Sequence, residues 1–205
     1  MIRLIIHGIT NKTDALAAAR LGIDGLGFIL DESSDRYIEY TLAQNIIHEL
    51  PPGVAVFLQP DRLDTDYLGE LVRKLRVSSL ILPVDEVAPV HESLGCRLTL
   101  RGDGQSILRH ANASGQSRQY LPEDLSLAQI RELSPENRHS WLDVVNAHHL
   151  LVSCGLPPEE LTSALDKFTP AALFFRGETE DHSGLQDFPT IQAYIRAKAA
   201  RIERV

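Results

Sequence analysis

The hydrophobic positions of this chain form short apolar runs that alternate with amphipathic segments. The first run, Ile2–His7, is almost entirely apolar and is therefore typical of a strand buried on both faces. Asn11 and Thr13 are possible N-caps for a helix over Asp14–Leu21. A second apolar run, Asp24–Leu30, follows the helix. The opening of the chain thus predicts a strand, a helix and a second strand, the repeating unit of a parallel sheet.

The same alternation continues along the rest of the chain. The predicted strands are Ile2–His7, Asp24–Leu30, Gly53–Leu58, Ser78–Leu82, Arg97–Arg101, Arg118–Leu121, His149–Ser153 and Ala171–Phe175. The predicted helices are Asp14–Leu21, Leu42–Leu50, Asp64–Leu75, Glu86–Leu94, Gln105–Ala111, Leu125–Leu133 with His139–Ala147, Pro158–Phe168 and Phe188–Ile202. Strands and helices at about 25 residues per unit predict an α/β fold, the (β/α)8 TIM barrel. An open doubly wound sheet is the alternative, but Gly102-Asp103-Gly104 matches its usual Gly-x-Gly-x-x-Gly signal only in part.

Composition narrows the class of protein further. The chain has 205 residues, 43% of them hydrophobic, and no linker-like stretch, which predicts one barrel domain over residues 1–205. No apolar run approaches the roughly 20 residues of a membrane helix, and the amino terminus lacks the order of a signal peptide, so we expect a cytoplasmic protein without a membrane partner. The net charge of −8 and the lack of a basic stripe argue against nucleic acid.

The cysteines and histidines do not suggest a metal. Cys96 and Cys154 lie far apart without metal-type spacing and are expected to be free thiols. The adjacent pair His148 and His149 would point to opposite faces of a strand. We therefore expect no metal and no cofactor.

Polar residues at the predicted strand ends are the candidates for chemistry, because barrel enzymes carry their sites on the loops after the strands. His7 could be a proton-transfer group or could merely close the barrel interior through a backbone hydrogen bond. Arg36 could bind an anion or be an ordinary solvated arginine, and Glu123 and Asp124 could simply begin the next helix. The candidates at this end of the barrel are His7, Arg36, Glu123, Asp124, Ser153, Cys154, Gly155, Arg176 and Gly177.

Several of these residues stand in segments that resemble the phosphoribosylanthranilate isomerase family of tryptophan biosynthesis. The similar segments are Ile5-Ile6-His7-Gly8-Ile9-Thr10-Asn11, Ser34-Asp35-Arg36-Tyr37-Ile38, Leu151-Val152-Ser153-Cys154-Gly155-Leu156 and Phe175-Arg176-Gly177-Glu178. The resemblance implies a (β/α)8 barrel that carries out an Amadori-type aldose-to-ketose isomerisation of a phosphorylated, carboxylated substrate. It also implies that Arg36 engages the anthranilate carboxylate, for which its planar fork is suited.

The chain departs from the family where the chemistry takes place. His7 stands at the position of the family's general-base cysteine, and an imidazole with a pKa near 6.5 is a reasonable base at neutral pH. The family's general-acid aspartate falls near Tyr120-Leu121-Pro122, which leaves Glu123 and Asp124 as displaced candidates.

The phosphate-binding loops of the family are altered as well. The first glycine-rich loop of the family corresponds to Leu133-Ser134-Pro135-Glu136 in this chain. The resemblance leaves only four residues for the other two loops: Ser153, Gly155, Arg176 and Gly177. Two functions are therefore expected: isomerisation of phosphoribosylanthranilate or a related anionic compound, or a noncatalytic barrel that binds a small anionic ligand or a protein partner. The expected assembly is a monomer or a homodimer.

Overall fold

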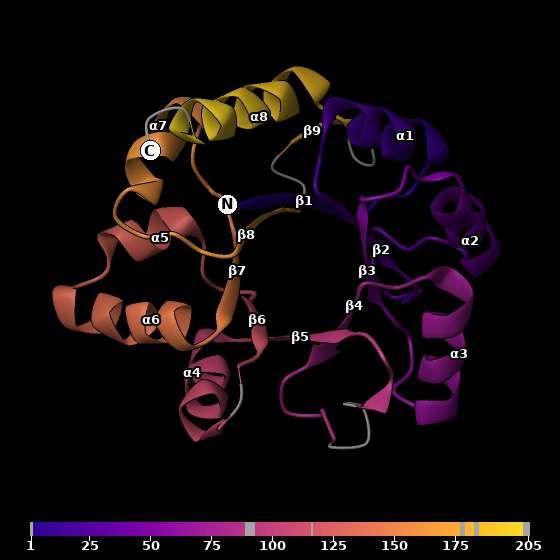
Figure 1. Ribbon diagram of the computed structural model, residues 1–205, viewed down its shortest axis with the longest axis horizontal. Helices are drawn as coiled ribbons and strands as arrows, with labels where there is room; N and C mark the ends of the chain where they lie inside the picture. The colour runs from indigo at the N-terminus through magenta and orange to yellow at the C-terminus, as the bar shows by residue number, and fades with distance from the viewer. Residues whose placement is uncertain (1, 89–92, 116, 177–178, 183–184, 203–205) are drawn as a thin grey trace.

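The strands of this protein close into a parallel barrel. A computed structural model describes residues 2–88, 93–115, 117–176, 179–182 and 185–202. The barrel runs in sequence order from β1 to β8, and β8 pairs with β1 to close it (Figure 1). Its strands are β1 (Arg3–His7), β2 (Gly25–Ile29), β3 (Ala55–Gln59), β4 (Ser79–Pro83), β5 (Arg97–Gly102), β6 (Gln119–Pro122), β7 (His149–Ser153) and β8 (Ala172–Phe175). The predicted barrel and its eight strands are confirmed, and the open sheet is excluded.

Helices form the outer ring of the barrel (Figure 1). They are α1 (Lys12–Leu21), α2 (Tyr40–Glu49), α3 (Thr65–Leu75), α4 (Gly104–Ala113), α5 (Leu127–Glu132), α6 (Pro135–Ala147), α7 (Pro158–Leu165) and α8 (Phe188–Ile202). Of the two predicted caps of the first helix, Asn11 is the one used, because its side chain accepts a hydrogen bond from the Asp14 amide at 2.9 Å.

The predicted helix over Glu86–Leu94 is wrong. Residues 84–86 form a turn, residues 89–92 lie outside the described part of the chain, and the described remainder of the segment contains no α-helix. Pro89 in the middle of the segment gives the physical reason, since proline has no amide donor and disfavours helical backbone in the residue before it. The described parts of the connection between β4 and β5, residues 84–88 and 93–96, thus add no α-helix to the outer ring.

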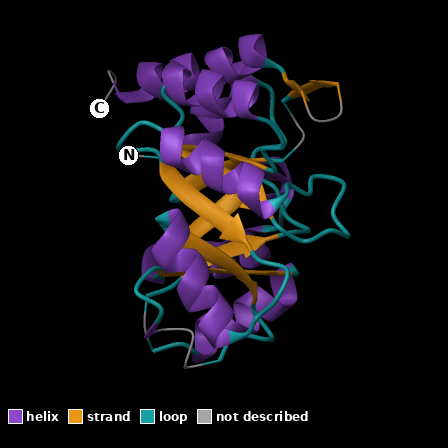
Figure 2. Cartoon of the chain, turned by 90° about the vertical axis from the view of Figure 1, so that its right-hand side faces the viewer, coloured by secondary structure: helices purple, strands orange, loops and turns teal. Residues whose placement is uncertain are grey.

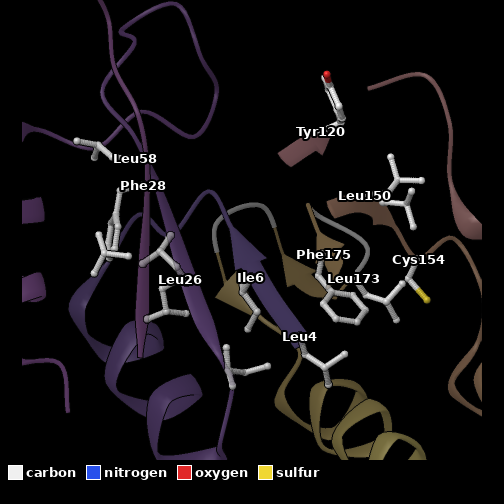
Figure 3. Close-up of a cluster of buried hydrophobic side chains, with 14 of the residues drawn as sticks. Leu4, Ile6, Leu26, Phe28, Leu58, Tyr120, Leu150, Cys154, Leu173 and Phe175 are labelled. Carbon is white, nitrogen blue, oxygen red and sulfur yellow. The ribbon is translucent and has the colours of Figure 1, made fainter. Parts of the chain in front are cut away.

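Two apolar layers hold the barrel together. The larger one lies between strands and helices, where outward side chains such as Leu4, Leu26 and Phe175 are buried (Figure 3). The smaller one fills the barrel interior and consists of Ile5, Phe57, Ile81, Leu121, Leu151, Ala172 and Phe174. This division follows from the strand period of two, which sends alternate side chains inward and outward.

The same alternation places polar side chains at both ends of the interior. On β1 the inward positions are Arg3 at the amino-terminal end, Ile5 in the middle and His7 at the carboxyl-terminal end. On β5 the corresponding positions are Arg97, Thr99 and Arg101. The apolar interior therefore separates two polar regions, one at each opening of the barrel.

The loops after the strands lie together at the carboxyl-terminal end. In Figure 2 the strand arrows point to the right, and the hairpin of β9 (Glu180–His182) and β10 (Leu185–Gln186) projects on that side. The hairpin is tied to α1 because the Gln186 amide donates to the Asp14 carboxylate at 3.0 Å. Among the helices of the described ranges, none is both long and apolar enough to span a membrane.

Candidate active site

His7 ends β1 and lies at the centre of the carboxyl-terminal opening. Its side chain is only 2% exposed and packs against Phe174, with ring centroids 5.2 Å apart. Neither ring nitrogen hydrogen-bonds to any protein group in the described part of the chain. The alternative in which His7 is held by a backbone hydrogen bond is therefore not what the structure shows.

Two glycines make room for this arrangement. A Cβ on Gly27, the β2 partner of His7, would overlap with Cδ2 of the imidazole ring. Gly8 has a φ of +85°, and a Cβ there would lie 2.5 Å from Cδ of Arg36. Only glycine leaves room for the imidazole ring beside residue 27 and for the Arg36 side chain beside residue 8.

Three arginines act electrostatically on the imidazole. Burial, followed by the positive charges of Arg176, Arg101 and Arg36, lowers the pKa of His7 to about 3. The imidazole is hence neutral at physiological pH, and it is a far weaker base than an ordinary histidine. The imidazole of His7 is therefore protonated only at a pH well below 6.5, the ordinary pKa of histidine.

The guanidinium of Arg36 is bound by a carboxylate of the same chain. Glu180, on β9, accepts from both terminal nitrogens of Arg36, and the Nη2–Oε2 distance is 2.7 Å. The two side chains are 13% and 8% exposed, so the pair is largely shielded from water. Gln186 donates to Glu180 at 3.4 Å. The resemblance assigns Arg36 to the carboxylate of a substrate. In this structure Arg36 instead binds the carboxylate of Glu180.

Glu123 bridges the other two arginines. Its carboxylate lies 3.1 Å from Nη1 of Arg101 and 3.6 Å from Nη1 of Arg176. Together His7, Arg36, Arg101, Glu123 and Arg176 form what we call the mouth cluster. With Glu180 included, three arginines face two glutamates, which leaves one net positive charge around a neutral imidazole.

The other predicted site residues lie outside this cluster. Asp124 accepts a hydrogen bond from the Gly104 amide at 2.8 Å and so serves the first turn of α4. Ser153 ends β7 beside Ser126. Gly155, with a φ of +59°, lines a cleft of about 530 Å³ between α5 and α7. Asp124 and Gly155 are thus not brought to the imidazole.

Two further expectations concern the phosphate loops. Gly177 lies outside the described residues. The segment from Leu133 to Glu136 joins α5 to α6, where Ser134 is the N-cap, Pro135 is the first helical residue and Glu136 is exposed. The loop that directly follows β6 is instead residues 123–126, and α5 lies between that loop and Leu133.

Sequence reasoning missed Arg101 and Glu180. Arg101 could have been found from the inward series Arg97, Thr99 and Arg101 on β5, because a polar residue at the last inward position of a barrel strand faces the opening. No sequence pattern indicates the role of Glu180, because its partner Arg36 is 144 residues away in the chain. No group of three or more potential metal ligands occurs within the described ranges.

A polar cluster at the carboxyl ends of eight parallel strands defines a (β/α)8-barrel protein with its candidate site where barrel enzymes carry theirs. No family model matches the chain. It is, however, 27% identical to N-(5'-phosphoribosyl)anthranilate isomerase of Thermotoga maritima over 96% of its own length and 98% of that protein. The enzyme of Pseudomonas putida is 29% identical over 96% of this chain and 97% of its own. By sequence the chain is a divergent relative of the phosphoribosylanthranilate isomerases.

Solved structures agree in fold. The Thermotoga maritima isomerase structure superposes with a TM-score of 0.78 at 23% identity and covers 98% of this chain and 100% of that one. A second isomerase structure, in complex with reduced 1-(o-carboxyphenylamino)-1-deoxyribulose 5-phosphate, has a TM-score of 0.77 at 24% identity, with 97% and 100% covered. The resemblance noted in the sequence therefore extends to the whole barrel.

Proposed function

We propose that the mouth cluster binds a small phosphorylated or carboxylated ligand of the class on which phosphoribosylanthranilate isomerases act. The observation that carries this proposal is the convergence of Arg36, Arg101 and Arg176 on a buried imidazole whose nitrogens bond to no described protein group. Arginine forks held in place by the fold suit the oxygens of phosphate and carboxylate.

Isomerisation of a phosphoribosyl-arylamine is the reaction that the relatives' names suggest for this site. An aldose-to-ketose isomerisation requires a base to remove a proton from C2′ and an acid to protonate the ring oxygen as it leaves. We assign the base role to His7, which ends β1, and the acid role to Glu123, which directly follows β6. Arg36 would then hold the ligand's carboxylate once Glu180 is displaced.

A specific set of contacts favours a second function, ligand binding without turnover. The pKa of about 3 makes His7 a weak base. The carboxylate of Glu123 is engaged by two arginines of the same chain, so its oxygens are not free to contact a ligand. Arg36 is occupied by Glu180. We expect weak or absent isomerase turnover for these reasons.

Complementation of a tryptophan auxotroph that lacks the isomerase separates the two functions. Growth that depends on His7, and is lost in His7→Ala, would establish isomerisation. No growth, together with a rise in Tm when the reduced carboxyphenylamino-deoxyribulose phosphate is added, would establish ligand binding without turnover. Absence of both effects would overturn the proposal.

A further inference from the structure

The amino-terminal opening of the barrel carries a second basic cluster, on the side away from the mouth cluster. Arg3 begins β1, Arg97 begins β5 and His149 begins β7, and all three side chains are exposed. With Gln119 they line one cleft of about 320 Å³. A neighbouring hollow of about 340 Å³ shares Arg97, Gln119 and His149, and adds Arg118.

Among the described residues, the basic side chains of this cleft, Arg3, Arg97 and His149, have no carboxylate partner. Within the described part of the chain, Arg3 and Arg97 form no ion pair, and no aspartate or glutamate lines either hollow. Asp24, at the same end of the barrel, is taken by Lys198 at 2.5 Å and by the Leu4 amide at 2.8 Å. An unpaired basic cluster in a chain of net charge −8 favours an anion.

Gln119 adds a buried polar group that faces the cleft. It is 8% exposed, and its Oε1 accepts from the Thr99 hydroxyl at 2.7 Å and from the Ser79 hydroxyl at 3.3 Å. These bonds fix the carbonyl side of the amide toward β4 and β5. Its Nε2 donors form no hydrogen bond with the described chain, so they are available to a ligand in the cleft that Gln119 lines.

We propose that the amino-terminal opening is a binding site for a phosphate group, held by Arg3, Arg97 and the amide of Gln119, with His149 at its rim. β1 and β5 lie on opposite sides of an eight-stranded barrel, so the two guanidinium groups approach a shared ligand from opposite directions. A tetrahedral phosphate presents acceptor oxygens on all sides, whereas a carboxylate presents both of its oxygens on one side. The cleft has room for a small phosphate monoester.

This site is separate from the mouth cluster. Arg3 and His7 on β1, and likewise Arg97 and Arg101 on β5, are four positions apart in sequence, which corresponds to about 13 Å along a strand. The apolar interior, with Ile5 and Phe174, lies between them. Binding at the amino-terminal opening therefore does not depend on the function proposed for the mouth.

Backbone NMR with inorganic phosphate at constant ionic strength tests the proposal. We expect saturable shifts at the amides of Arg3, His149 and Ala171, with a binding constant weakened about tenfold or more in Arg97→Ala, as loss of a charge-assisted hydrogen bond requires. Arg97→Lys, which keeps the charge but loses the fork, should fall between the two.

Matched variants make the result specific. Arg73→Ala removes an exposed arginine from α3 and should leave the shifts unchanged. Arg3→Ala reports on the same site from the opposite strand if Arg97→Ala is unstable. The proposal would be overturned by shifts that do not saturate or by equal shifts in Arg3→Ala and wild type. Shifts that accompany formation of a dimer would overturn it as well.

Discussion

His7 is the residue whose environment differs most from what its sequence position predicts. An imidazole at the end of a first barrel strand suggests an ordinary titrating group, yet burial and three arginines keep it neutral. The sequence placed His7, Arg36, Glu123 and Arg176 at one end of the barrel correctly, because strand ends follow from periodicity. It could not reveal the desolvation or the Arg36–Glu180 pair, which arise from packing between distant segments.

The lowered pKa of His7 predicts an acid sensitivity of folding. Between its ordinary value of 6.5 and about 3, the unfolded chain holds a proton on His7 that the folded chain does not. The free energy of unfolding should therefore fall as the pH is lowered through this window, by roughly 1 kcal/mol per pH unit. Urea unfolding between about pH 6 and pH 4.5 should show a steeper loss for wild type than for His7→Gln. Equal slopes would contradict the buried, neutral imidazole.

At the scale of the elements, the strands were predicted well and one connection was not. Continuous apolar runs identify parallel strands because both of their faces are buried, as for β1 and β7. The segment after β4 has the composition of a helix but contains Pro89. The resemblance puts the glycine-rich loop at Leu133–Glu136, whereas the helix predicted over Leu125–Leu133, which the structure confirms as α5, separates that segment from β6.

The fit of β1 against β2 depends on Gly27. In Gly27→Ala the new methyl group would overlap the His7 ring, and we expect a loss of about 1–3 kcal/mol in the free energy of unfolding. Gly69→Ala is the matched control, because Gly69 lies within α3 and its nearest neighbour, Cδ2 of Leu94, would be 3.8 Å from the new Cβ. That change should stabilise the protein by about 0.5–1 kcal/mol. Chemical denaturation of both variants measures the contrast, and equal effects would show that Gly27 does not limit the packing of His7.

At the scale of the whole molecule, the barrel gathers basic side chains that are dispersed along the chain. The sequence has no basic stripe and a net charge of −8, yet each opening of the barrel collects arginines from separate strands and loops. Such clusters cannot be seen in linear charge patterns, because they depend on strand register and barrel closure. The apolar interior keeps the two openings apart, so each can be tested by itself.

The most direct test of the account is a calorimetric titration with reduced 1-(o-carboxyphenylamino)-1-deoxyribulose 5-phosphate, the ligand of one isomerase structure of the same fold. If the mouth cluster binds such anions, wild type should show saturable binding that weakens about tenfold or more in Arg101→Ala, while Arg73→Ala, the control on α3, behaves as wild type. Absence of binding, or equal dissociation constants in wild type and Arg101→Ala, would contradict the central claim that the arginines around His7 form an anion site.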